Sequence, residues 1–211
     1  MAGVRPQVSR PSARLVYRCC NVPFEFFDIE NMTEVSINKQ ARLSQHLTSS
    51  SVATLGHSSE LDGSRLSPHF TLGELCKTSA KTQDGNIPSH VHIENLKRLC
   101  GWLEMLRSEW NKRYGEGDDP IVINSGYRSE AVNKAVGGVK GSNHLTGCAA
   151  DIRVAGIEQL VRYATILLDI SDESQEDFDE LLLERSPRGG YWLHFAVRPS
   201  GNRRKVRLIQ T

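Results

Sequence analysis

Two stretches of the chain repeat apolar residues at the three- to four-residue spacing of an amphipathic helix. The first follows Pro88 and ends before Gly115 and Gly117; its apolar positions are Ile93, Leu96, Leu99, Cys100, Leu103, Leu106 and Trp110. The second covers about residues 156–169, with Ile157, Leu160, Val161, Ala164, Leu167 and Leu168 on one side. We expect both stripes to face a hydrophobic core, because a helix of this pattern buries its apolar side.

Two shorter helices are indicated by their first residues. Thr71-Leu72-Gly73-Glu74 has the form of a capping box, in which the threonine hydroxyl and the glutamate carboxylate bond to free amides of the first turn. Ser129 is a suitable N-cap for a helix that runs to Val136, and Gly137-Gly138 ends it.

Four segments have the composition of strands. Ile121–Ile123 is a short apolar run, and three segments follow the second long helix: Phe178–Glu184, Tyr191–Val197 and Lys205–Gln210. Helices that come mostly before strands indicate an α+β domain. We therefore expect a small antiparallel sheet packed with helices.

The chain divides near residue 65. Residues 1–20 are basic and lack acidic residues, and residues 44–59 are polar and rich in serine. Such segments bury too little apolar surface to offset the entropy lost on ordering. We expect residues 1–64 to be a disordered extension and residues 65–211 to be the folded domain.

Composition excludes several classes of protein. The net charge of +1 gives no electrostatic reason to expect nucleic acid as a partner. No apolar run is long enough for a membrane span, and the basic amino terminus lacks the apolar core of a signal peptide. Five cysteines without a Cys-x-x-Cys pair favour reduced thiols. As written, the chain is expected in the cytoplasm.

Three residues have the types and number of ligands found in a catalytic zinc site. His144 and Asp151 lie seven positions apart, and His194 follows in the strand-like Tyr-Trp-Leu-His-Phe-Ala-Val. An odd spacing on one straight strand would point His144 and Asp151 to opposite faces, so Gly147 between them indicates a turn. Two imidazoles and one carboxylate leave a fourth zinc position for water. Taken singly, each residue is more often a hydrogen-bonded polar group than a ligand.

The residues around this trio carry a family resemblance. Residues 121–153 contain Ser-Gly-Tyr-Arg and then Ser-x-His-x-x-Gly-x-Ala-x-Asp, spelled here Ser142-Asn143-His144-Leu145-Thr146-Gly147-Cys148-Ala149-Ala150-Asp151. This arrangement resembles the D-Ala-D-Ala carboxypeptidase-type zinc peptidases, metallopeptidase family fifteen. The resemblance runs from about Leu66 to about Arg207 and implies an α+β fold with one zinc ion per chain, held by His144, Asp151 and His194.

The resemblance also implies roles beside the metal. Arg128 matches a family arginine that stabilises an oxyanion or holds a substrate carboxylate by its planar fork. It also implies that the substrate is contacted by Ser142, Tyr127 and Tyr191. For Ser142 the alternative is a turn hydroxyl that only satisfies local backbone.

The general base is where this chain departs from the family. Many relatives carry an acid three residues before the second histidine, where this chain has Tyr191. A tyrosine with a pKa near 10 is a poor base at neutral pH. If the strand that contains Glu184 pairs antiparallel with 191–197, Glu184 can point toward the metal, and we favour it as the base. Its alternative role is a charge that closes an edge strand.

The sequence therefore predicts a zinc-dependent hydrolase of peptidoglycan-type peptides, acting as a monomer. It would reach the cell wall after lysis or by another export route. Terminal D-alanine trimming and internal cleavage of the stem peptide both stay open, as does a bacterial or a phage origin. The alternatives from other classes are a non-catalytic, zinc-stabilised wall-binding module, as in the hedgehog relatives, and a phage structural component.

Overall fold

The structure of the protein is a computed structural model that describes residues 64–210. The extension expected over residues 1–64 lies outside the described residues except for its last position, so its disorder and the boundary near residue 65 stay predictions.

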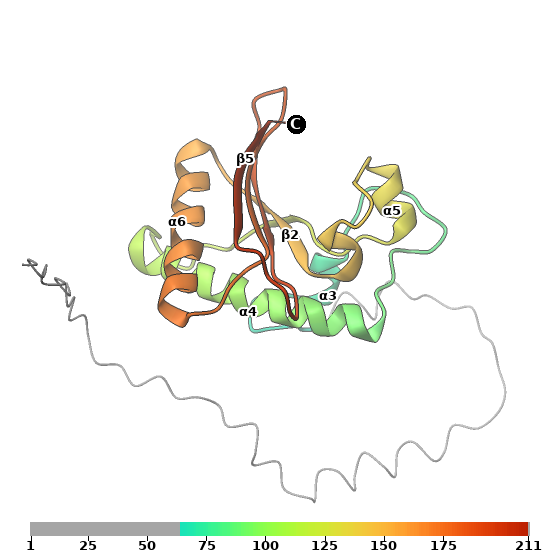
Figure 1. Cartoon of the computed structure of the whole chain (residues 1–211), viewed down its shortest axis with the longest axis horizontal. Coiled ribbons are helices and arrows are strands. Elements are labelled where there is room, and N and C mark those ends of the chain that lie inside the picture. Colours follow the sequence, from blue (N-terminus) through green and yellow to red (C-terminus); the bar gives the residue numbers. More distant parts are fainter. Residues whose placement is uncertain (1–63, 211) are drawn as a thin grey trace, which may run out of the picture. The chain divides into compact units, whose positions relative to one another are not determined.

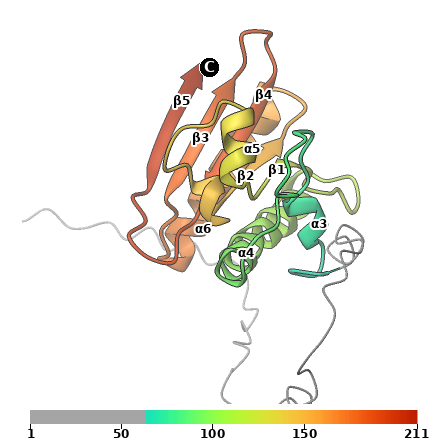
Figure 2. The ribbon, with the colours of Figure 1, turned by 90° about the vertical axis from the view of Figure 1, so that its right-hand side faces the viewer.

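Five strands form one sheet, which Figure 1 shows nearly edge-on. Their order is β1-β2-β4-β3-β5, and Figure 2 labels each of them. Their bounds are β1 Ile123–Ser125, β2 Ala149–Arg153, β3 Glu180–Arg185, β4 Tyr191–Ala196 and β5 Lys205–Gln210. The pairs β1–β2, β2–β4 and β3–β4 are antiparallel, whereas β3–β5 is parallel. The α+β class is thus confirmed, with a mixed rather than a wholly antiparallel sheet.

The direction of β5 follows from the order of the strands. After β4 the chain reverses through residues 197–204, and β5 then lies on the far side of β3 from β4. Because β4 is antiparallel to β3, one further reversal makes β5 parallel to β3. Composition predicts the strand itself but carries no information about which neighbour it joins.

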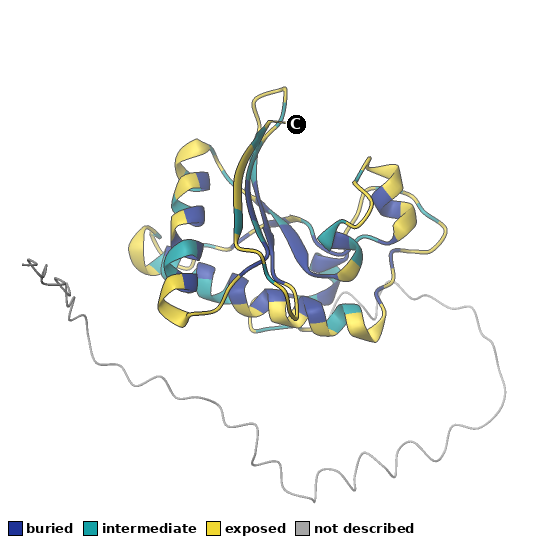
Figure 3. Cartoon of the chain, viewed as in Figure 1, coloured by how far each residue is buried: buried dark blue, intermediate teal, exposed yellow. Residues whose placement is uncertain are grey.

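Two long helices, α4 (His90–Arg113) and α6 (Ile157–Ser174), supply most of the apolar cover of the sheet. Figure 3 shows the buried residues gathered where these helices meet the strands. In α4 the predicted stripe is confirmed, and Trp102 adds contacts with Phe178 and Phe195. In α6 the predicted stripe is partly wrong: Ile157 and Val161 are exposed, whereas the residues that turn inward instead are Tyr163, Ile166 and Ile170.

Short helices surround the first half of the sheet. α3 (Leu72–Leu75) begins after Thr71, whose hydroxyl accepts from the amide of Glu74, and α5 (Glu130–Ala135) begins after Ser129 in the same way. Both predicted N-cap hydroxyls are confirmed. A 3-10 helix, η2 (Asn143–Thr146), comes just before β2. Figure 2 shows α5 in front of the sheet and α6 behind it, so the two helices lie on opposite faces.

Gly147 makes the turn that the sequence predicts between η2 and β2. Its φ is 71°, in the left-handed region that favours glycine, and it ends η2. A Cβ at this position would lie 2.6 Å from the carbonyl oxygen of His92 in α4. Both the backbone angle and the close approach to α4 therefore require glycine.

Candidate metal centre

His144, Asp151 and His194 come together from three elements. His144 lies on η2, Asp151 on β2 and His194 on β4, and the last two are direct partners in the antiparallel β2–β4 pair. His144 and His194 are buried. The turn at Gly147 lets η2 fold back over β2, which brings an imidazole seven residues upstream to the carboxylate.

The three side chains meet at one point. The Nε2 atom of His144 lies 3.2 Å from Oδ1 of Asp151 and 3.2 Å from Nδ1 of His194, and these last two atoms are 3.0 Å apart. Zinc ligands at about 2.0–2.1 Å in a tetrahedron lie about 3.3 Å from each other. The triangle therefore has the size of one face of a tetrahedral zinc site.

In His144 and in His194, one ring nitrogen points away from the triangle and has a partner there. That partner determines which nitrogen faces the triangle. His144 Nδ1 is 2.7 Å from the carbonyl oxygen of Gly126, which can only accept, so Nδ1 carries the hydrogen and Nε2 keeps a lone pair. His194 Nε2 lies 3.6 Å from Oε2 of Glu180, which leaves Nδ1 to face the triangle. Converging lone pairs on two imidazoles and one carboxylate suit zinc.

The protonation of the cluster also suits a cation. Burial lowers the pKa of His144. Burial would raise the pKa of Asp151, but His144 and His194 outweigh it and hold that pKa below its usual value. Burial would lower the pKa of His194, yet its contacts with Asp151 and Glu180 prevail and raise it to about 9. The two carboxylates thus stabilise a positive charge beside His194, which a proton or a metal ion can supply.

The structure brings Arg128 to this cluster. Its Nη2 pairs with Oδ2 of Asp151, the oxygen that points away from the triangle, and its Nε donates to the hydroxyl of Ser125 at 2.8 Å. The backbone amide of Arg128 donates to the carbonyl oxygen of His144 at 3.1 Å. The Ser-Gly-Tyr-Arg segment therefore supports both the ring and the carboxylate of the candidate site.

Glu184 lies on the same face of the sheet as the cluster. Leu182 of β3 is the direct partner of His194, so Glu180, Leu182 and Glu184 share the face of His194. Glu184 lies two residues along the strand from Leu182, a rise of about 6.6 Å. Burial raises the pKa of Glu184 above its usual value. The structure thus places a half-buried carboxylate beside the metal cluster, from the strand that the sequence indicates.

The three residues predicted to contact substrate lie in different surroundings. Tyr191 is three positions before His194 on β4, so its side chain takes the opposite face and packs against the core. Tyr127 is buried, with its ring centroid 4.9 Å from that of His92. The hydroxyl of Ser142 accepts from the amide of His144 at 3.4 Å and caps η2. The structure therefore brings neither tyrosine to the metal cluster, and Ser142 fills the role of a turn hydroxyl.

The sequence analysis missed Glu180, which contacts the outward nitrogen of His194. A signal for it exists: Glu180 and Glu184 lie at even spacing on one strand, so any argument that points Glu184 at the metal applies to Glu180 as well.

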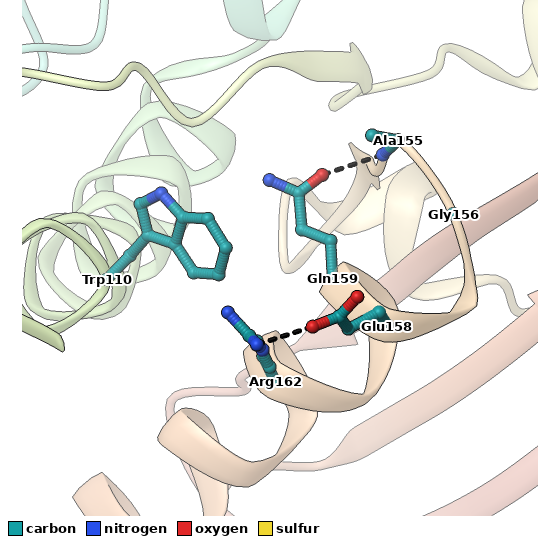
Figure 4. A pocket seen from close by; sticks show the side chains of 6 residues that line it. All are labelled: Trp110, Ala155, Gly156, Glu158, Gln159 and Arg162. Carbon is teal, nitrogen blue, oxygen red and sulfur yellow. Dashed lines mark hydrogen bonds and ion pairs between the residues drawn. The ribbon is translucent and has the colours of Figure 1, made fainter. Parts of the chain in front are cut away.

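A cavity of about 390 Å³ lies elsewhere, at the start of α6. Its lining is Trp110, Ala155, Gly156, Glu158, Gln159 and Arg162 (Figure 4). Its polar groups bond to each other, since Gln159 Oε1 accepts from the amide of Ala155 and Arg162 pairs with Glu158. The cavity shares no residue with the metal cluster and is not part of the candidate site.

Comparison with known proteins relates the chain to a family of peptidases. The family model described as Peptidase M15 matches residues 68–168, which include His144 and Asp151. The zinc D-Ala-D-Ala carboxypeptidase of Streptomyces albus G is 31% identical to the chain over 84 residues, which are 40% of this chain and 31% of that protein. The chain thus spans about a third of the length of this curated relative. Among residues 64–210, no helix has both the length and the apolar content needed to cross a bilayer.

Proposed function

The chain belongs to the peptidase M15 family, and from this premise we propose that it is a zinc-dependent hydrolase of peptidoglycan-type peptides, with carboxypeptidase-like action. The observation that carries the proposal is the triangle of two imidazole nitrogens and one carboxylate oxygen, with sides of 3.0–3.2 Å. His144, Asp151 and His194 would hold one zinc ion per chain. When bound, zinc would supply a Lewis acid for the peptide carbonyl and would lower the pKa of an attacking water.

Glu184 is the proposed general base. Two acids flank the cluster on β3, and their surroundings set their pKa values apart, which separates their roles. The contact with His194 and the ammonium of Lys205 hold the pKa of Glu180 well below its usual value. Burial raises that of Glu184, which forms no ion pair within residues 64–210. A carboxylate that is more basic and has no fixed partner is the better acceptor for a proton from water.

Arg128 is the proposed anion-binding group. Its guanidinium carries five N–H donors, and the contacts with Asp151 and Ser125 occupy only some of them. The remaining donors can bind the oxyanion of the transition state or the free carboxylate of a terminal D-alanine. Ser142 remains a proposed neighbour of substrate. Tyr127 and Tyr191 are left out, because their rings pack in the core.

The proposal is tested by incubating the zinc-loaded chain with a stem peptide that ends in D-Ala-D-Ala and measuring the products by mass spectrometry. We expect release of the terminal D-alanine, and loss of that activity when a chelator removes the metal. Cleavage only inside the stem would replace carboxypeptidase action by endopeptidase action. No hydrolysis of any wall peptide by zinc-loaded protein would overturn the proposal in favour of a non-catalytic wall-binding module.

Two substitutions test the choice of base in the same assay. Glu184→Gln should keep zinc binding while lowering the turnover rate by roughly 100-fold or more, the scale of a general base. Tyr191→Phe is the control from the neighbouring strand and should have a small effect, because that ring lies on the other face of the sheet. The reverse ranking would remove Glu184 from the mechanism.

A further inference from the structure

Glu180 occupies a defined position beside the metal cluster. It is the first residue of β3, on the face that carries His194, and its Oε2 lies 3.6 Å from His194 Nε2. Its side chain is only 14% exposed. This largely buried carboxylate faces the nitrogen of His194 that points away from the triangle, so it is placed to act on the ring and not on substrate.

Three donors fix this carboxylate. Lys205 Nζ lies 2.8 Å from Oε1, Arg203 Nη2 lies 3.0 Å from the same oxygen, and Asn143 Nδ2 donates to Oε2 at 3.0 Å. The neighbouring Asp179, fully buried, holds two of these donors in turn, because it accepts from both Arg203 and Asn143. Both oxygens of Glu180 are therefore held by donors, and Oε2 also faces His194 Nε2.

The two histidines present different ring nitrogens to the centre of the cluster. His144 presents Nε2, and its Nδ1 lies 2.7 Å from the Gly126 carbonyl oxygen. His194 presents Nδ1, and its Nε2 faces the Glu180 carboxylate at 3.6 Å. A neutral imidazole has one hydrogen, and the partner of the outer nitrogen decides where it sits. Within residues 64–210, the group that faces Nε2 of His194 and can hold that hydrogen there is the carboxylate of Glu180.

We propose that Glu180 is a positioning residue that fixes His194 in the tautomer with its lone pair on Nδ1, facing the metal. This inference rests on the proposed function, since it assigns the residue a task at the same zinc site. Carboxylate partners of metal-binding histidines orient the ring and increase its basicity. Asn143, Arg203 and Lys205 then serve the metal indirectly, by holding Glu180 in place.

The substitution Glu180→Gln tests the proposal sharply. The amide has one acceptor oxygen and one donor nitrogen. Lys205 and Arg203 both contact Oε1 and attract the amide oxygen to that position, whereas only Asn143 among the three contacts Oε2. The amide nitrogen then turns to His194 Nε2, which must accept. The ring hydrogen moves to Nδ1 and points into the triangle, where it opposes metal binding.

The measurement is zinc affinity by competition with a chelating dye, combined with ¹⁵N NMR of the neutral histidine rings in the metal-free and the zinc-loaded chain. In the wild type we expect His194 to carry its hydrogen on Nε2. Glu180→Gln should weaken zinc binding by roughly 10- to 100-fold, the usual effect of removing such a partner. The matched control, Glu184→Gln on the same strand and face, removes the same charge and should weaken zinc binding distinctly less, because no hydrogen bond or ion pair joins Glu184 to a proposed ligand within the described residues.

The outcomes separate this inference from the proposed function. Failure of the wild type to bind zinc would contradict the proposed function itself. Zinc binding by the wild type with unchanged affinity in a folded Glu180→Gln variant would overturn only the role of Glu180, as would a hydrogen on Nδ1 of His194 in the wild type. A variant that loses thermal stability but keeps zinc affinity and the ring spectrum would show a merely structural residue. If the variant does not fold, the spectrum of the metal-free wild type with neutral rings decides the matter, because zinc on Nδ1 would by itself place the hydrogen on Nε2.

Discussion

Asp151 and His194 face each other directly across β2 and β4, with Oδ1 of the aspartate 3.0 Å from Nδ1 of the histidine. Because the two strands are antiparallel neighbours, this distance is set by the sheet and not by flexible loops. The turn at Gly147 brings His144, which lies on η2, to these two residues. The candidate metal centre is therefore built on the most constrained part of the domain.

The turn at Gly147 should be essential for this geometry. Gly147→Ala combines an unfavourable positive φ with a Cβ 2.6 Å from the carbonyl oxygen of His92. Gly137→Ala is the matched control, since Gly137 has a similar φ of 75° but open space around it. We expect the control to lose about 1 kcal/mol of unfolding free energy. Gly147→Ala should lose distinctly more and bind zinc more weakly, as measured by denaturant unfolding and zinc titration. Equal losses in the two variants would contradict the close-approach argument.

Arg128→Lys should impair turnover more than folding. Lysine keeps the charge but cannot reach Asp151 and Ser125 together and still present donors to substrate. We expect kcat/KM to fall by roughly 100-fold, the loss typical for a donor to developing negative charge. Arg153→Lys is the control: Arg153 lies two residues after Asp151 on β2 and contacts Asn124. Unchanged kinetics in Arg128→Lys would remove that arginine from the site.

Asp179 should make the fold sensitive to acid. Burial would raise its pKa, but bonds from Arg203 and Asn143 outweigh burial and lower it below the usual value near 3.8. A carboxyl group whose pKa is lower in the folded state contributes stability above its unfolded pKa, and that stability is lost as pH falls through the folded pKa. Metal-free wild type should therefore lose stability below about pH 4 more steeply than Asp179→Asn.

At pH 7 the same variant should be less stable than wild type by about 1–3 kcal/mol, because a buried charge-assisted network is broken. Asp172→Asn is the control, since Asp172 is exposed and pairs with Arg204 at the surface. It should change stability by less than about 1 kcal/mol. Thermal melts across the pH range measure both effects. Equal slopes for Asp179→Asn and wild type would contradict the assignment.

Local chemistry explains what the sequence predicted well. The caps at Thr71 and Ser129 and the turn at Gly147 depend on neighbours in the chain, and each is confirmed. The inward residues of α6 depend on which side of the helix meets the sheet. Periodicity alone therefore misplaced Ile157 and Val161.

Which side chains surround the metal cluster also depends on tertiary structure, because the register of the strands decides which residues share a face of the sheet. Tyr191 and His194 are close in sequence, yet an odd spacing on β4 separates them by the thickness of the sheet. Glu180 and Glu184 are distant in sequence from His144 but share its side of the sheet through the β3–β4 pairing. The parallel partner of β5 could not be predicted at all, because it depends on the path of the chain around β3.

The central claim is tested most directly by the zinc content of the purified chain under metal-replete conditions, measured by elemental analysis. We predict close to one equivalent of zinc per chain, because the described residues contain one cluster of this kind, His144, Asp151 and His194. The double variant His144→Ala/His194→Ala should retain almost none. Absence of zinc from the wild type, or an undiminished zinc content in the double variant, would contradict the account.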